Sequence, residues 1–179
     1  AKACVNQIIS DLDNAIALLP SQWPASERGR ITRGAAAALK GRVLLFYASP
    51  QFNPSNLQER WEAAYQANKE AKDLCLADGY SLYSIFEKIF TDESKTNEAI
   101  FLTVYDNINR TNSYENSVRP RSESNDQTAV NNAPNWEFVK SFPMKDGKSI
   151  INHPEYDSLY YWKNRDPRFY ATIAYNGCK

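Results

Sequence analysis

The residues between positions 106 and 136 include the side chains best suited to hold a polar ligand. Tyr114 and Trp136 could act as flat platforms, because the polarised C–H groups of a sugar face stack on aromatic rings. Amide, carboxylate and guanidinium groups on the same stretch could pair with sugar hydroxyls. We therefore predict a ligand-binding surface made of Tyr114 and Trp136 together with Asn112, Asn116, Arg119, Arg121, Asn125 and Asp126.

A second interpretation of the same stretch stays open. Residues 106–134 are polar and lack helical or strand periodicity. A loop of this length in a compact domain is usually either functional or unstructured. The stretch could therefore be a solvated loop whose Tyr114 and Trp136 pack into the core.

Patterns that would support catalysis are weak. A glycosidase needs two carboxylates about 5–10 Å apart, one of them with a raised pKa. Among 21 acidic residues such pairs arise by chance, and His153 is the only histidine that a nucleophilic triad could use. The six glycines are scattered and form no phosphate-binding loop. We predict a protein that is not an enzyme and that uses no cofactor and no metal. The carboxylate pairs considered are Asp11 with Asp13, Asp92 with Glu93, and Asp157 with Asp166.

The overall charge argues against a polyanionic partner. The chain of 179 residues has 21 Lys and Arg against 21 Asp and Glu, so its formal net charge is zero. A local basic group surrounds residues 28–42, but a nucleic-acid motif is lacking. No apolar run of 18 residues is present, so no membrane-spanning helix is expected. The cysteines, Cys4, Cys75 and Cys178, have no zinc-type spacing, and their pairing cannot be assigned.

The first 80 residues show helical periodicity. Apolar residues recur at helical spacing over 5–19, and Pro20 ends that run. Thr32 is a predicted N-cap for a second helix, apolar nearly all round, that reaches about residue 48. Ser55 and Gln58 form a capping-box pattern before a third helix, which ends at Asp78 and Gly79. Short connections predict antiparallel neighbours, and the second and third helices resemble a tetratricopeptide pair without a regular 34-residue repeat.

Beyond residue 80 the pattern becomes mixed. Residues 98–105 (EAIFLTVY) predict a buried strand, and residues 136–142 predict a short amphipathic helix capped by Asn135. Residues 170–175 alternate like a strand and run into Asn176-Gly177, a strong hairpin signal. Because the returning strand would lie beyond residue 179 and the chain opens almost directly in a helix, we expect both ends to be cut from a larger protein.

Five segments together resemble the SusD/RagB family, in the family's order and rough spacing. The landmarks span nearly the whole chain, and each is weak alone. They are Ala38-Leu-Lys-Gly-Arg-Val-Leu-Leu-Phe-Tyr-Ala-Ser-Pro-Gln-Phe-Asn53, Trp61-Glu-Ala-Ala-Tyr65 with Gly79-Tyr-Ser-Leu-Tyr83, Asn97-Glu-Ala-Ile-Phe101, Phe142-Pro-Met-Lys-Asp-Gly147, and Asn164-Arg-Asp-Pro-Arg-Phe-Tyr-Ala-Thr-Ile173. The family often has Pro-Thr-Gln before the Phe-Pro-Met segment, where this chain has Pro134-Asn-Trp136.

The resemblance implies a fold and a role. The fold class would be mostly α, with tetratricopeptide-like helical hairpins, irregular loops and a few short β-strands. The chain would be part of a single SusD-like domain, with a helical scaffold over about 1–80 and a loop-rich, mixed region over about 81–179. The family consists of surface-exposed outer-membrane lipoproteins of Bacteroidetes-type bacteria that capture nutrients. The lipid anchor would lie outside this chain, so no cysteine here is assigned to it.

Two functional hypotheses follow. In the first, the protein binds a glycan or another oligomeric nutrient for uptake through a SusC-like TonB-dependent transporter. In the second, it is a helical-repeat scaffold or protein-interaction module without a ligand site of its own. Capture predicts that Tyr114 and Trp136 are exposed together on a loop face. Scaffolding predicts that both are buried and that an apolar patch lies on the helical surface instead.

Overall fold

A computed structural model describes residues 2–91, 97–106, 108–112, 114–118, 132–175 and 177–178. The chain divides into two compact units. The first unit comprises residues 1–84 and 94–104, and the second comprises residues 85–93 and 105–179. In chain order the elements are α1 (Lys2–Leu18), η1 (Ala25–Glu27), α2 (Arg33–Ala48), α3 (Gln58–Ala77), η2 (Phe86–Lys88), α4 (Tyr114–Val118), α5 (Trp136–Ser141) and α6 (Pro167–Thr172).

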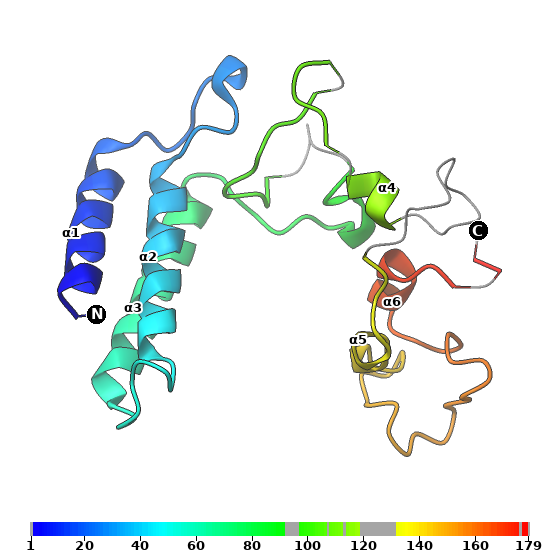
Figure 1. The fold of residues 1–179 in the computed structure, drawn as a ribbon. Coiled ribbons are helices and arrows are strands. Elements are labelled where there is room, and N and C mark those ends of the chain that lie inside the picture. Colours follow the sequence, from blue (N-terminus) through cyan, green and yellow to red (C-terminus); the bar gives the residue numbers. More distant parts are fainter. Residues whose placement is uncertain are drawn as a thin grey trace. The chain divides into compact units, whose positions relative to one another are not determined.

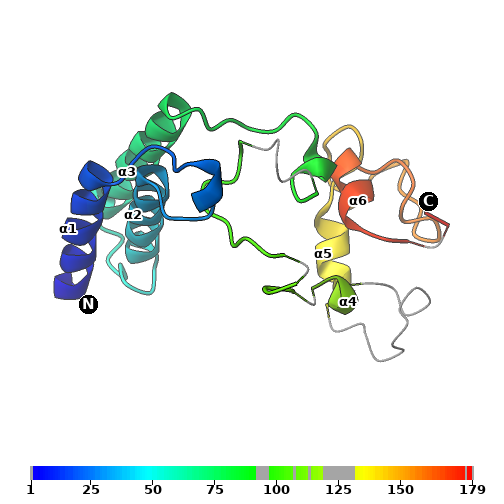
Figure 2. The ribbon, with the colours of Figure 1, turned by 90° about the horizontal axis from the view of Figure 1, so that it is seen from above.

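The first unit is built on three long helices that lie side by side, with α2 in contact with both α1 and α3 (Figures 1 and 2). Successive helices run in opposite directions (Figure 1), which confirms the predicted antiparallel arrangement. The Thr32 side chain accepts a hydrogen bond from the backbone N–H of Ala35, so it caps α2 as predicted.

Small residues bring α2 and α3 close together. The buried residues of α2 are Gly and Ala only, and those of α3 are three alanines and Cys75. At the contact, Asn68 Nδ2 donates to Gly41 O at 3.1 Å and to Ala64 O at 2.8 Å. A Cβ added at Gly41 would lie 2.6 Å from Asn68 Oδ1. Any larger residue at position 41 would therefore have to displace the Asn68 amide.

The two ends of α3 are fixed by different side chains. The predicted capping box is wrong, because the N-cap of α3 is Leu57 and no side chain caps it. Instead, Asn53 Oδ1 accepts from Leu57 N at 2.8 Å and shapes the turn before the helix. At the other end, Arg33 binds the Asp78 carboxylate through two nitrogens, one of them Nε at 2.8 Å. This pair joins the start of α2 to the end of α3.

Helix α1 is held less firmly than its neighbours. No residue of α1 is buried. Lys40 of α2 pairs with Asp13 of α1 at 2.6 Å, but Asp13 is half exposed, so water screens the pair. The contact of α1 with α2 therefore depends mainly on partly covered apolar side chains.

The second unit is built from short helices and turns around one small core. Val139 of α5 packs with Phe169 of α6 and Ile173, and four partly buried aromatic residues surround them. Asn135 Oδ1 accepts from Phe138 N at 2.8 Å, which confirms the predicted cap and helix at α5. The segment 156–162 is a series of turns and bends.

Both predicted strands are wrong. Residues 98–105 have no strand partner within the described part of the chain, and Val104 instead packs against Gly29 of the preceding loop. A strand needs a partner for its backbone groups, and an apolar run alone does not supply one. Residues 170–172 belong to α6, because Asp166 caps that helix and Pro167 starts it. The spacing of four between Phe169 and Ile173 then places both in the core.

The fold class is otherwise confirmed. The described part of the chain is mostly helical, and its single β feature is the isolated antiparallel bridge between Met144 and Arg165. The expected few short strands are thus reduced to one bridge.

The approach of α2 to α3 predicts the effect of filling position 41. Gly41→Leu should lower the free energy of unfolding by about 1–3 kcal/mol, because an overpacked interface must displace Asn68 and its two hydrogen bonds. Urea denaturation would measure the change. The control Arg42→Leu adds the same side chain one residue later at an exposed position, and we expect a change within about 0.5 kcal/mol. Equal effects of the two variants would contradict the account of this interface.

Candidate functional site

The site begins with Trp136, the first residue of α5. Its indole is 47% exposed, although the residue starts a helix that packs on the core of the second unit. Within the described residues no acceptor lies within hydrogen-bonding distance of the indole N–H. The edge of the ring meets Tyr161, with ring centroids 5.3 Å apart and planes at 87°. One side of Trp136 is therefore supported by protein, and part of the ring faces solvent.

Further aromatic residues continue from this contact. Tyr161 meets Trp162 edge to face at 5.1 Å, and Trp162 stacks on Tyr175 at 5.7 Å with planes 16° apart. We call Trp136, Tyr161, Trp162 and Tyr175 the aromatic row. Tyr160 lies beside the row, against Trp162 at 5.7 Å, and Lys163 Nζ lies 3.9 Å from the centroid of the Tyr160 ring.

The guanidinium of Arg165 joins α5 to the aromatic row. Arg165 is 2% exposed. Its Nη1 donates to Tyr161 O at 2.6 Å, and its Nη2 donates to the carbonyls of Val139 at 2.8 Å and Phe142 at 2.6 Å. The positive charge is thus satisfied by backbone carbonyl dipoles from α5 and from the aromatic row. Within the described chain no carboxylate pairs with it.

Burial has a clear electrostatic effect on this side chain. Desolvation lowers the pKa of Arg165 from its ordinary value, yet an arginine stays protonated in a protein at neutral pH. The Arg165 Cζ also lies 4.7 Å from the centroid of the Phe169 ring. Its buried Nε has no hydrogen-bond partner among the described residues. Removing the guanidinium would leave three carbonyl groups without their donor.

Two of the family-like segments meet at Arg165. Met144 and Arg165 form the antiparallel bridge, flanked by Lys145 N donating to Asn164 O at 2.8 Å and Asp166 N donating to Pro143 O at 3.0 Å. Met144 and Phe169 are fully buried. The segments 142–147 and 164–173 are therefore joined by backbone hydrogen bonds and core packing next to α5, the helix that begins with Trp136.

Two carboxylates stabilise the turns of these segments. Asp146 accepts from Lys148 N at 3.1 Å and contacts His153 Nε2 at 3.2 Å, and these bonds lower its pKa to about 2. Asp166 accepts from the side chain and the backbone N–H of Arg168, which lowers the pKa of Asp166 to about 2. His153 and Asp166 are thus turn residues and show no catalytic arrangement.

The predicted ligand residues occupy several environments. Tyr114 begins α4 and is 67% exposed, but its ring makes no contact with Trp136 in the described structure. Asn112 Oδ1 accepts from Tyr114 N at 3.2 Å and so shapes the start of α4. The side chain of Asn116 is not described, although its backbone is part of α4. The other predicted residues lie outside the described part of the chain. They are Arg119, Arg121, Asn125 and Asp126.

Sequence reasoning missed the residues that support Trp136. Tyr161 and Arg165 are about 25 to 29 positions away in sequence, and nothing local links them to Trp136. The available signal was the large number of aromatic residues in the segment 156–162. That signal does not show that Tyr161 contacts both Trp136 and Trp162.

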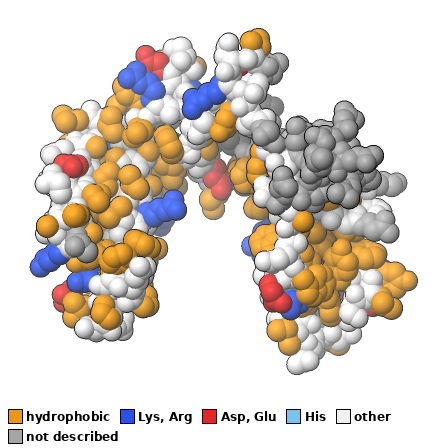
Figure 3. Space-filling model, viewed as in Figure 1, with side chains coloured by type: hydrophobic (Ala, Val, Ile, Leu, Met, Phe, Trp, Pro, Cys, Tyr) orange, Lys and Arg blue, Asp and Glu red, His pale blue; other side chains and the backbone are white. Residues whose placement is uncertain are grey.

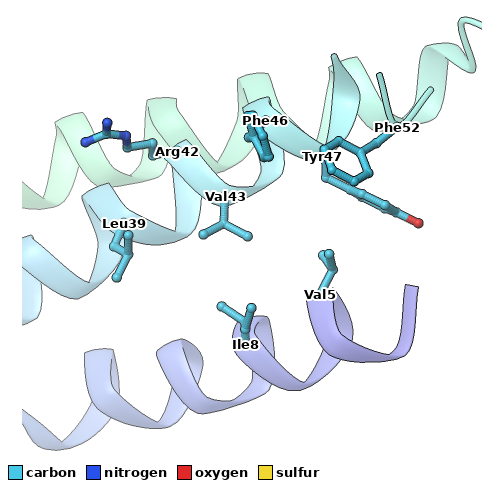
Figure 4. A pocket seen from close by; sticks show the side chains of 8 residues that line it. All are labelled: Val5, Ile8, Leu39, Arg42, Val43, Phe46, Tyr47 and Phe52. Atoms are coloured by element: carbon cyan, nitrogen blue, oxygen red, sulfur yellow. The ribbon is translucent and has the colours of Figure 1, made fainter. Parts of the chain in front are cut away.

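The first unit presents a different feature, an apolar groove between α1 and α2. Figure 4 shows Val5 and Ile8 of α1 facing Leu39 and Val43 of α2. The groove has a volume of 340 Å³, and Phe46 at its end is 61% exposed. In Figure 3 hydrophobic side chains gather over these helices. We call this surface the helix groove.

Other kinds of site find little support. Within the described residues no group of three or more His, Cys, Asp and Glu side chains could hold a metal ion. None of the helices described is both long enough and apolar enough to cross a bilayer. The three cysteines are free thiols, with Cys75 buried and the other two exposed.

Comparisons with known proteins identify the class. The model of the SusD family matches residues 97–179. A crystal structure of a SusD-like protein from Bacteroides fragilis is similar over 95% of this chain, with 25% sequence identity and a TM-score of 0.69. A search of curated proteins finds no match. The chain is thus similar to SusD-family proteins, most clearly over residues 97–179, and it spans 34% of the length of that solved protein.

The role of Arg165 predicts a large loss of stability on its removal. Arg165→Met should lower the free energy of unfolding by about 3 kcal/mol or more, because several buried carbonyls lose a charged donor. Denaturation followed by tryptophan fluorescence would measure it. Arg168→Met is the control, since that arginine is exposed and its removal should lower the free energy of unfolding much less. A small effect of Arg165→Met would show that water replaces the guanidinium.

The turn carboxylates predict a dependence of stability on acid. The folded-state pKa values of Asp146 and Asp166 are about 2, below the unfolded value of about 3.9. Their contribution is therefore complete above about pH 4 and is lost as the pH falls toward 2. Between pH 6 and pH 2 the melting temperature of Asp146→Asn should fall less steeply than that of wild type, because the variant lacks one of these carboxylates. Asp73→Asn, at an exposed position on α3, should leave the slope unchanged.

Proposed function

We propose that the protein binds a glycan without catalysis, for uptake through a partner TonB-dependent outer-membrane transporter. The similarity to SusD-family proteins supports a role in nutrient binding in general. The observation in this chain that supports the proposal is the half-exposed Trp136 ring. Trp136 contacts the Tyr161 ring, and Arg165 fixes the backbone of Tyr161 by a hydrogen bond.

The chemistry of the surface suits a sugar. An indole offers a flat apolar face for the C–H side of a pyranose ring and an N–H donor for one hydroxyl. A ring held by its neighbours loses little conformational freedom on binding, so more of the contact energy appears as affinity. Tyr114 and the predicted polar residues of 112–126 would extend this surface, and they remain proposals.

The cellular setting follows the family. We place the protein as part of a single SusD-like domain in a surface-exposed lipoprotein of the outer membrane, of the Bacteroidetes type. The likeness to a protein from Bacteroides fragilis supports this setting. In this view the transporter receives the glycan that the Trp136 surface captures.

The helix groove supports the second candidate function, a scaffold that docks a protein partner. Each function has one supporting feature. Tyr114 and Trp136 are each exposed, although the two described rings do not contact each other, and an apolar surface lies on the helices. The two functions are compatible, because the groove belongs to the first unit and Trp136 to the second.

Affinity electrophoresis against a panel of polysaccharides tests the capture function. We expect at least one neutral glycan to retard the protein, and Trp136→Ala to bind about 3- to 10-fold more weakly, as lost aromatic stacking implies. Tyr65→Ala removes another exposed aromatic ring, from α3, and should bind normally.

Two results would count against the proposal. Retardation that is equal in wild type and Trp136→Ala would move the site elsewhere. No retardation by any glycan, for a chain shown to be folded by circular dichroism, would favour the scaffold function.

A further inference from the structure

The first unit contains a pocket that the proposed function does not use. It is lined by parts of the loop 22–32, by residues 79–80 and by the segment 97–102, all within the first unit. We call it the loop pocket. Its volume is 370 Å³, at the lower end of the range of about 300–1,000 Å³ that small-molecule sites occupy.

Trp23 and Arg30 form one wall of the loop pocket. The indole Nε1–H of Trp23 donates to Ile31 O at 2.8 Å, so the loop closes on itself. The Arg30 Cζ lies 4.3 Å from the centroid of the Trp23 ring, within the range of a cation–π contact. The position of the guanidinium is therefore set by the ring beneath it.

The opposite wall of the loop pocket is the segment 97–102, which continues to Val104 beside the same loop. Gly29 has a φ of +96°, and a Cβ added there would lie 2.9 Å from Val104 Cγ2. On the same segment, Asn97 O accepts from Ser81 N at 3.1 Å, which ties it to the chain after α3. These contacts hold the two walls together, so the pocket is formed before a ligand arrives.

The floor of the loop pocket provides a spare hydroxyl hydrogen. Thr32 Oγ1 and Tyr80 OH lie 3.3 Å apart, and Thr32 Oγ1 also accepts from Ala35 N. The two hydroxyls have two hydrogens, and their shared bond uses only one. Within the described residues the other hydrogen has no acceptor, so it is available to a ligand oxygen.

The charge of the lining is of one sign. Arg28 and Arg30 are the charged side chains that line the pocket, and both are cationic. Glu27, which is outside the lining, pairs with Arg30. Because both partners are about half exposed, water screens that pair and it stabilises little. A guanidinium also suits a carboxylate, whose two oxygens it can bind at once.

We propose that the loop pocket binds an acidic sugar residue, a uronate. Its carboxylate lies on the Arg30 guanidinium, and its ring hydroxyls pair with the Thr32–Tyr80 hydroxyls and the Asn97 amide. The site is separate from the Trp136 surface and does not rest on the function proposed for that surface, since its residues belong to the first unit.

Calorimetric titration of the whole chain tests this assignment. The probes are tri-galacturonate and the neutral galactotriose, which has the same number of rings. We expect the acidic trisaccharide to bind, the neutral one to bind about tenfold or more weakly, and affinity to fall with added salt. Arg30→Met should weaken binding of tri-galacturonate by about tenfold or more.

Two control variants separate this site from the others. Arg42→Met makes the same substitution on α2 within the helix groove, and Trp136→Ala alters the proposed neutral-glycan surface. Arg42→Met should bind tri-galacturonate as wild type does, and Trp136→Ala should weaken that binding less than Arg30→Met does. If Arg30→Met does not fold by circular dichroism, Tyr80→Phe removes one hydroxyl, retains the ring and should bind about 3- to 10-fold more weakly.

Several outcomes would overturn the proposal. These are no binding of tri-galacturonate by the folded wild type, equal binding of galactotriose that Arg30→Met weakens to the same extent, and loss of tri-galacturonate binding in Trp136→Ala with retention in Arg30→Met or Tyr80→Phe. Displacement by inorganic phosphate at the same concentration as the trisaccharide would show a simple anion site and overturn the sugar assignment.

Discussion

The second unit depends on one buried positive charge. The Arg165 guanidinium reaches the carbonyls of Val139, Phe142 and Tyr161, which come from separate parts of the chain. Helices as short as α5 and α6 are not stable alone, because nucleation is costly and few hydrogen bonds repay it. They are held by tertiary contacts, and Arg165 provides the polar part of those contacts. The position of Trp136, at the start of α5, follows from the same interaction.

The two units reach stability by different routes. In the first, glycine and alanine allow α2 and α3 to approach closely, and Asn68 bridges them. In the second, large rings pack edge to face around Phe169, and the backbone is irregular. Close helix packing leaves little room between α2 and α3, so the open surfaces of the first unit are the helix groove and the loop pocket. The aromatic packing of the second unit instead leaves part of the Trp136 ring exposed.

This division separates two kinds of residue. Met144, Arg165 and Phe169 lie in the segments that resemble the family, and all three are buried in the second unit. Their types are dictated by packing and hydrogen bonding. Trp136 and Arg30 are exposed, and neighbouring groups support them without requiring that residue type. The proposed binding roles are assigned to residues of this second kind.

The sequence by itself determined the long helices, the caps at Thr32 and Asn135, and the resemblance to the SusD family. Those features depend on local spacing and on hydrogen bonds that span three or four residues, so they can be read from neighbours in the chain. Local pattern failed at 98–105 and 170–175. An apolar run does not say whether a strand partner exists, and the Asp166-Pro167 start of α6 outweighed the alternation after it. The candidate sites were decided only by tertiary structure. Trp136 with Tyr161 and Trp23 with Tyr80 are far apart in sequence, and only folding brings together the groups that support each site.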